Sequence, residues 1–281
     1  MNKMIYVSLL ANTGIGNEVL KSLLSIPYVI VDSVLTRRFE SDYPFYHTKE
    51  LYQEAESNGI LCFTNKDVNT DYYDYIKNRK IDVILVATFN QIIKNDILNL
   101  PNVLIVNYHP SLLPKYRGPS PISWMILNGE RKAGITIHLL TNEIDAGDII
   151  LQQEIDIEEK EILGSLLFKL SKLSSKMTCE FFDLYYNNNI ELRQQDASES
   201  TYFKRPLKER EFSNSDSFSY IEKRLRAFHP FPGSILIDDN REKFIVKDFK
   251  ISNEKLRSKN FNKSLIKDGL NIMLNVESAP K

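Results

Sequence analysis

The sequence predicts an α/β fold with a doubly wound, mostly parallel sheet and a small β subdomain in the C-terminal part. Three observations predict it. Short apolar runs alternate with helically spaced segments, two of these runs are apolar at nearly every position, and paired strand signals follow residue 200. Such alternation is typical of parallel sheets, and continuous apolar runs are typical of strands buried on both faces. The 281 residues allow two domains, which we place at residues 1–200 and 201–281.

The elements of the first half follow from apolar spacing and from turn residues. Strand signals cover residues 5–10, 29–35, 81–88 and 103–108, and helical spacing covers 18–24, 48–58 and 72–79. Gly59 is suited to end the second of these helices in a left-handed conformation. After His109 the glycine and prolines of residues 110–121 predict a constrained loop. A helix over 122–128, strands over 134–140 and 149–157 and a long amphipathic helix over 158–187 follow.

The last part of the chain has a different pattern. Residues 187–210 are polar and indicate a linker, and residues 217–228 have helical spacing. Strand signals at 234–238 and 243–249 flank a polar turn, and a second hairpin is expected around Asp268-Gly269. These signals predict a helix followed by a small sheet.

Composition excludes several classes of protein. The content of 42% hydrophobic and 26% charged residues excludes global disorder, and the formal net charge of −1 argues against a polynucleotide as the main partner. The two cysteines, Cys62 and Cys179, lack the spacing of a metal site or a disulfide framework. No apolar run approaches the roughly 20 residues that span a bilayer. We therefore expect a cytoplasmic protein that needs no metal and no membrane.

The candidate chemistry lies where the strand over 103–108 ends. Asn107 and His109 are two residues apart, so their side chains point to the same side of an extended segment. Asp145 lies in an acidic turn between two predicted strands and reaches His109 if both strands join the same sheet. An amide, an imidazole and a carboxylate suit acyl transfer, because the carboxylate orients the imidazole, the imidazole moves a proton and the amide stabilises an oxyanion.

Simpler interpretations stay open for these residues. A lone histidine is more often structural than catalytic, and an acidic turn is more often only solvated. Gly14 and Gly16, after the first strand, lack both the third glycine of a dinucleotide site and the lysine of a phosphate-binding loop. That pair is better explained as a tight turn between strand and helix.

A dense block of residues resembles the formyltransferase family that uses 10-formyltetrahydrofolate. The resemblance is carried by Asn107-Tyr108-His109-Pro110-Ser111-Leu112-Leu113-Pro114-Lys115-Tyr116-Arg117-Gly118 and by Ile144-Asp145-Ala146-Gly147-Asp148-Ile149. It implies a Rossmann-like formyltransferase fold with Asn107, His109 and Asp145 as the catalytic residues. It also implies that 10-formyltetrahydrofolate is the co-substrate, held by two segments whose residues are Thr88, Phe89, Asn90, Gln91, Ile92, Thr141, Asn142 and Glu143.

The resemblance covers three branches with different acceptors. The glycinamide ribonucleotide branch is shorter, without the stretch that here runs Arg-Ala-Phe-His-Pro-Phe-Pro-Gly. The tRNA branch carries a glycine- and lysine-rich insertion and a larger basic barrel, whereas residues 36–47 here hold two arginines offset by Glu40 and Asp42, and 48 residues follow Gly233. The nucleotide-sugar branch fits best, with methionyl-tRNA formyltransferase as the alternative.

The expected acceptor is the amino group of a dTDP- or UDP-linked sugar, a 4-amino-4,6-dideoxyhexose, and the expected assembly is a homodimer. Substrate contacts are predicted at Asn12, Tyr43, Tyr46, Lys115, Tyr116 and Arg117. The tyrosines either cover the base or sugar or pack within their loop, and Arg117 either meets the pyrophosphate or braces its loop. Two further alternatives remain, a hydrolase that releases formate and a non-catalytic binder of nucleotide sugar or folate.

Overall fold

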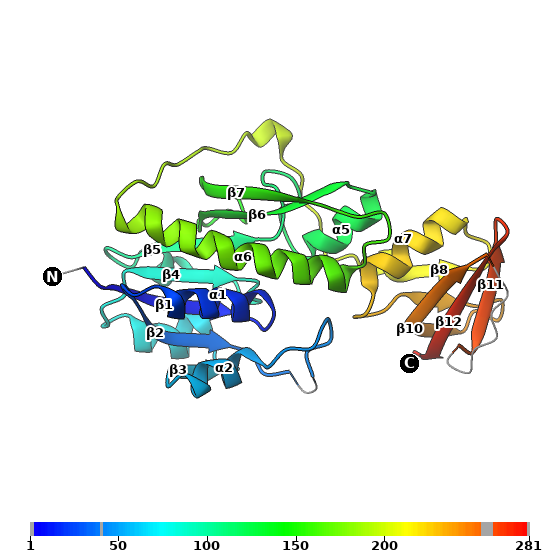
Figure 1. Ribbon diagram of the computed structural model, residues 1–281, viewed down its shortest axis with the longest axis horizontal. Coiled ribbons are helices and arrows are strands. Elements are labelled where there is room, and N and C mark those ends of the chain that lie inside the picture. Colours follow the sequence, from blue (N-terminus) through cyan, green and yellow to red (C-terminus); the bar gives the residue numbers. More distant parts are fainter. Residues whose placement is uncertain (1–2, 40–41, 254–260, 280–281) are drawn as a thin grey trace. The chain divides into compact units, whose positions relative to one another are not determined.

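The computed structural model describes residues 3–39, 42–253 and 261–279, and Figure 1 shows its ribbon. The chain divides into two compact units. Unit 1 comprises residues 1–118, 132–156 and 167–202, and unit 2 comprises residues 119–131, 157–166 and 203–281. Glu40, which entered the comparison with the tRNA branch, lies outside the described residues.

Unit 1 is built on a seven-stranded sheet in the order β3-β2-β1-β4-β5-β6-β7. Its strands are β1 (Ile5–Ala11), β2 (Val29–Thr36), β3 (Leu61–Thr64), β4 (Val83–Ala87), β5 (Leu104–His109), β6 (Lys132–Leu139) and β7 (Ile149–Asp156). The first five strands pair in parallel, and β6 and β7 are added antiparallel. The strand order reverses between β1 and β4, which is where open α/β sheets bind their ligands. The predicted doubly wound, mostly parallel sheet is confirmed.

Helices lie against both faces of this sheet (Figure 1). Those of unit 1 are α1 (Ile15–Ser25), α2 (Leu51–Ser57), a π-helical turn (Val68–Tyr72), α3 (Tyr73–Ile76), α4 (Asn95–Leu98) and most of α6 (Leu163–Tyr186). The Ser22 hydroxyl of α1 donates to the backbone oxygen of Ser175 at 3.0 Å, so these two helices pack together. The π-turn, α3 and α4 share a buried cluster with inward residues of β1, β2, β4 and β5. All five residues of β4 are buried, as its continuous apolar run predicts.

Unit 2 contains α5 (Pro121–Asn128), α7 (Phe218–Phe228) and a second, five-stranded sheet in the order β11-β12-β10-β9-β8. Its strands are β8 (Glu211–Ser213), β9 (Ile235–Ile237), β10 (Lys243–Ser252), β11 (Lys263–Lys267) and β12 (Leu270–Ser278). Proline at the first position of α5 and left-handed Gly129 after its last residue set its bounds. The predicted small C-terminal β subdomain is confirmed.

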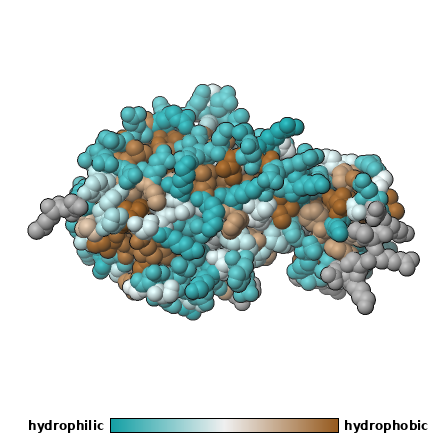
Figure 2. Space-filling model, viewed as in Figure 1, coloured by the Kyte–Doolittle hydropathy of each residue, from teal (hydrophilic) through white to brown (hydrophobic). Residues whose placement is uncertain are grey.

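The visible surface is mostly polar (Figure 2), while apolar residues of both strands and helices form the core. Among the described residues, we find no helix that combines the length and the apolar character needed to cross a bilayer.

Candidate active site

Asn107 and His109 project from the same side of β5 onto one carboxylate. The Nδ2 atom of Asn107 lies 3.3 Å from Oδ1 of Asp145, and Nδ1 of His109 lies 3.5 Å from the same oxygen. His109 is 5% exposed, and the Asp145 side chain is 12% exposed. The structure therefore brings together the three groups that suit acyl transfer: an amide to stabilise an oxyanion, an imidazole to move a proton and a carboxylate to orient the imidazole.

Asp145 reaches this position from the turn between β6 and β7, which folds back over β5. Its backbone is left-handed, with a φ of 52°, a conformation that costs a residue with a side chain about 1–3 kcal/mol. The backbone N–H of Gly118 donates to its Oδ2 at 2.8 Å. Oδ1 has only the longer contacts to Asn107 and His109 and one of 3.7 Å to His138. Of the two carboxylate oxygens of Asp145, Oδ1 is thus the one with the weaker contacts.

The hydrogen bonds of His109 define where its ring protons lie. Nε2 lies 2.8 Å from the backbone oxygen of Tyr116, and a carbonyl oxygen only accepts, so Nε2 carries a proton. Nδ1 then faces Asp145 Oδ1.

His138 is a site residue to which the sequence analysis assigned no role. It pairs with Asn107 across β5 and β6, is 1% exposed, and its Nε2 lies 3.1 Å from Asn107 Nδ2. Its Nδ1 donates to the backbone oxygen of Leu139 at 2.8 Å, so Nε2 is the acceptor that orients the amide. Burial foremost, and then the nearby charge of His109, lowers the pKa of His138 to about 4. A histidine in the strand over 134–140, whose other residues apart from Thr136 carry no polar side chain, was the signal available in the sequence.

The loop after β5 supplies structural as well as candidate substrate groups. The Lys115 side chain is exposed. Tyr116 is 7% exposed and left-handed, and its backbone oxygen is the acceptor for His109. The Arg117 guanidinium donates through Nε and Nη2 to Gln195 Oε1, at 3.2 and 2.7 Å, which is the bracing arrangement that the sequence left open.

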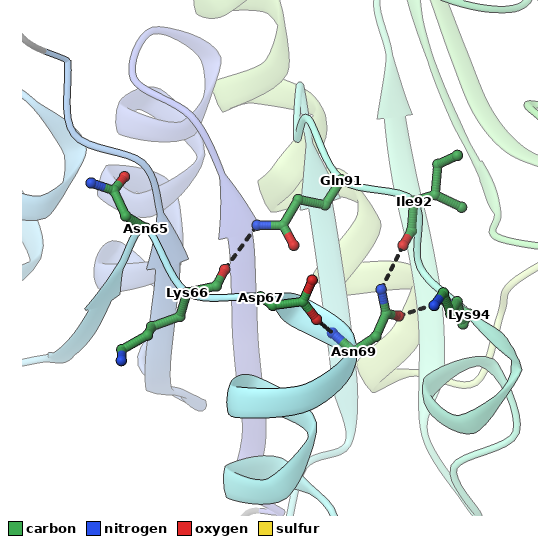
Figure 3. Close-up of a pocket in the computed structure, with 7 residues that line it drawn as sticks. All are labelled: Asn65, Lys66, Asp67, Asn69, Gln91, Ile92 and Lys94. Atoms are coloured by element: carbon green, nitrogen blue, oxygen red, sulfur yellow. Dashed lines mark hydrogen bonds between the residues drawn. The ribbon is translucent and has the colours of Figure 1, made fainter.

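The first predicted folate segment, residues 88–92, follows β4. The Gln91 amide is committed to the backbone, because it donates to the Lys66 oxygen and accepts from the Val68 N–H, both at 2.8 Å. It lines a pocket of about 400 Å³, drawn in Figure 3. The Ile92 side chain is 78% exposed. Thr88 and Phe89 are half-buried and Asn90 is exposed.

The second predicted folate segment lies in the turn that carries Asp145. Thr141, Asn142 and Glu143 are all exposed, and the Thr141 hydroxyl donates to the backbone oxygen of Glu143. Ile144 is a large apolar side chain with 53% of its surface exposed. Both predicted segments thus present one exposed isoleucine, the kind of side chain that covers a flat heterocycle.

Asn12 follows β1 at the point where the strand order reverses. Its Nδ2 donates to the backbone oxygen of Thr88 at 2.6 Å, which fixes the amide orientation because that oxygen only accepts. Asn12 is 8% exposed, and its Oδ1 has no hydrogen-bond partner in the described structure.

Tyr43 and Tyr46 lie in an aromatic cluster over the turn after β1. Tyr43 is 8% exposed and contacts the rings of Phe39, Phe45 and Tyr46, with centroids 5.1–5.5 Å apart. A Cβ atom added to Gly14 would lie 2.3 Å from the Tyr43 hydroxyl. The Gly14 turn is thus covered by a tyrosine, which agrees with a tight turn rather than a phosphate loop.

Among the residues that the structure describes, no three histidine, cysteine or acidic side chains are grouped as metal ligands. A family model described as formyl transferase matches residues 36–181, more than half of the chain. The chain belongs to the formyl transferase family.

Curated relatives of this formyl transferase chain are methionyl-tRNA formyltransferases. The protein of Thermotoga neapolitana is 37% identical over 182 residues, which cover 64% of this chain and 58% of the relative. This match therefore spans less than two thirds of the relative's length. The protein of Mycoplasma mycoides subsp. mycoides SC is 30% identical over 266 residues, which cover 92% of this chain and 82% of the relative.

Solved structures share the fold of this formyl transferase over nearly its whole length. An N-formyltransferase from Helicobacter canadensis, in complex with folinic acid and dTDP-3-aminofucose, aligns with a TM-score of 0.71 and 20% identity. The alignment covers 98% of this chain and all of that one. At this identity the likeness concerns the fold.

Proposed function

We propose that this protein transfers the formyl group of 10-formyltetrahydrofolate to the amino group of a nucleotide-linked amino-deoxysugar, a dTDP- or UDP-linked 4-amino-4,6-dideoxyhexose. The meeting of Asn107, His109 and Asp145 at one carboxylate oxygen, within a chain of the formyl transferase family, carries the proposal. The exposed side chains of Ile92 and Ile144 fit a flat pteridine, and their segments offer backbone groups for its ring edge.

The proposed chemistry divides among the three side chains. The amine nitrogen forms a bond to the formyl carbon, and the carbonyl electron pair moves onto oxygen. The Asn107 N–H and the His109 ring stabilise this oxyanion, since their contacts with Asp145 are long enough to yield to a substrate. Asp145 Oδ1 accepts the proton that the amine loses. The electron pair on the oxyanion then re-forms the carbonyl, the bond to folate N10 breaks, and N10 takes the proton that Asp145 had accepted. The products are a formamide and tetrahydrofolate.

For the acceptor, the proposal rests on the contacts of Arg37 and Arg38 and on Asn12. Arg37 and Arg38 lie over the rings of Phe39 and Tyr52, at 4.5 and 4.3 Å from the centroids, so these cations are engaged locally rather than extended toward a phosphate backbone. The unpartnered Oδ1 of Asn12 suits an N–H or O–H donor of a small acceptor, because a buried acceptor without a partner costs about 1–3 kcal/mol. Residues 1–202 contain 19 basic and 26 acidic side chains, which does not favour a long polyanion.

Methionyl-tRNA formyltransferase is the second candidate, and two observations favour it. The curated relatives described above carry that name at 30–37% identity. Residues 203–281 contain 17 basic and 11 acidic side chains, a surplus suited to phosphate contacts.

A side-by-side assay with 10-formyltetrahydrofolate tests the proposal. The acceptors are dTDP- and UDP-linked amino sugars, with the amine at carbon 3 or carbon 4, and methionyl initiator tRNA. Formamide on a sugar, with no product from tRNA, is the expected result. Product from tRNA alone would replace the sugar by the second candidate, and formate release without an acceptor would indicate a hydrolase.

A further inference from the structure

The segment that follows α6, residues 195–201, contacts the two residues that face the nitrogens of the His109 ring, Tyr116 and Asp145. Gln195 is 8% exposed, and its Nε2 donates to the backbone oxygens of Asp145 and Gly147, at 2.9 and 2.7 Å. Its Oε1 accepts from Arg117. The orientation of this amide is unambiguous, because carbonyl oxygens only accept and a guanidinium only donates.

Thr201 contacts Tyr116, the residue whose carbonyl faces the other nitrogen of the His109 ring. Its hydroxyl oxygen accepts the backbone N–H of Tyr116 at 2.8 Å, and its backbone oxygen accepts the N–H of Arg117 at 2.8 Å. The Tyr116 carbonyl in turn accepts from His109 Nε2. The Tyr116 residue is therefore held on its N–H side by Thr201 and turned so that its oxygen meets the histidine.

We propose that Gln195 and Thr201 are positioning residues for the reaction, which hold the Asp145 carboxylate and the Tyr116 carbonyl at the two nitrogens of His109. This inference rests on the proposed formyl transfer. It assigns a role in catalysis to a polar segment that composition alone describes as a linker.

Backbone strain explains why two such residues are needed. Asp145 and Tyr116 both have left-handed backbones, with φ of 52° and 62°. Non-glycine residues in this region persist when surrounding contacts fix them, at about 1–3 kcal/mol each. Without the Gln195 donors the turn relaxes and Asp145 Oδ1 moves from His109. Displacement of about 1 Å at a reacting group lowers a rate by about 100-fold.

Gln195→Glu is the sharpest test on the carboxylate side. It replaces the two donor N–H groups by an oxygen and leaves the acceptor for Arg117. We expect kcat to fall about 10- to 100-fold, while the KM for each substrate stays within about threefold of wild type. The chain has four histidines, so the ¹⁵N spectrum of the imidazoles is simple. We expect the His109 ring signals to shift from their wild-type positions, because Asp145 Oδ1 no longer lies beside Nδ1.

Gln152→Glu is the matched control. Its Nε2 also donates twice, to the Leu113 oxygen and the Thr136 hydroxyl, both at 2.8 Å, and its Oε1 also accepts from an arginine, Arg193, at 3.1 Å. This substitution should lower stability similarly while kcat and the His109 signals stay as in wild type.

Thr201 gives a second pair of variants if Gln195→Glu does not fold. Thr201→Val leaves the Tyr116 N–H without its acceptor and should change the His109 signals and lower kcat, whereas Thr201→Ser keeps the hydroxyl and should restore both. Wild-type kcat and unchanged His109 signals in Gln195→Glu, or in Thr201→Val, would overturn the positioning role. If the wild-type enzyme formylates no acceptor while the His109 signals still shift in the variants, the proposed function fails and the positioning role stands.

Discussion

The Asn107 amide is oriented by a neighbouring histidine, since its Nδ2 lies 3.1 Å from Nε2 of His138, a nitrogen without a proton. This contact leaves one Nδ2 proton of Asn107 directed at Asp145 and available to a substrate oxygen. In the proposed reaction the role of Asn107 therefore depends on a neutral His138, and burial lowers the pKa of His138 to about 4.

Acid should destabilise the protein through His138. Its pKa falls from 6.5 to about 4 on folding, so the unfolded chain binds a proton between these values and the folded chain does not. Titration of His138 therefore leaves the free energy of unfolding unchanged above pH 6.5 and lowers it by about 3 kcal/mol as the pH falls toward 4. In urea unfolding at pH 7.5 and pH 4, His138→Gln should lack this loss. The exposed His47→Gln should retain it, and equal losses in both variants would contradict the prediction.

Removing the charge of Asp145 should abolish most turnover without unfolding the site. In Asp145→Asn the side-chain oxygen still accepts from Gly118, but the carboxylate oxygen that faces Asn107 and His109 and accepts the amine proton in the proposed reaction is gone. We expect kcat to fall about 100- to 10,000-fold with a free energy of unfolding within about 1 kcal/mol of wild type. Asp148→Asn, in the same turn, is the control and should keep its rate. Comparable rates in the two variants would exclude Asp145 as the proton acceptor.

Gly14→Ala should destabilise unit 1 through the aromatic cluster. The new methyl would lie 2.3 Å from the Tyr43 hydroxyl, and the backbone φ is +105°. Gly59→Ala is a control for backbone strain alone, with φ +70° and no atom within 4 Å of the new methyl. We expect a loss of about 1 kcal/mol for Gly59→Ala and about 2–4 kcal/mol for Gly14→Ala, read by urea unfolding. A similar loss of unfolding free energy in both variants would mean that Tyr43 moves away from the new methyl group at no cost.

The sequence predicted those parts of the fold and site that depend on local pattern. The apolar run in β4 needs burial on both faces, and the two-residue spacing of Asn107 and His109 puts both on one side of β5, so the strand and this pair of side chains followed from spacing. Asp145 was expected to reach them only if the strands on either side of its turn joined the same sheet, which they do. The four-residue β3 was not predicted, because its pairing with β2, rather than its own pattern, defines it. The roles of His138 and Gln195 were missed for a related reason. His138 acts through a contact with Asn107 on the neighbouring strand, and Gln195 acts through a contact with Asp145, which lies 50 residues earlier in the sequence.

Asn12→Ala should weaken binding of the acceptor more than binding of the folate. Its Oδ1 is buried without a partner, so a substrate donor that reaches it gains a hydrogen bond without displacing another. We expect the KM for the amino sugar to rise about tenfold, while the KM for the formyl donor changes less than about twofold. Asn17→Ala is the matched control, because Asn17 is 1% exposed and both ends of its amide are already bonded, to the Gly14 N–H and the Lys49 oxygen. Steady-state kinetics and urea unfolding should then find lower stability but an unchanged acceptor KM in Asn17→Ala, and an unchanged acceptor KM in Asn12→Ala would remove Asn12 from the substrate site.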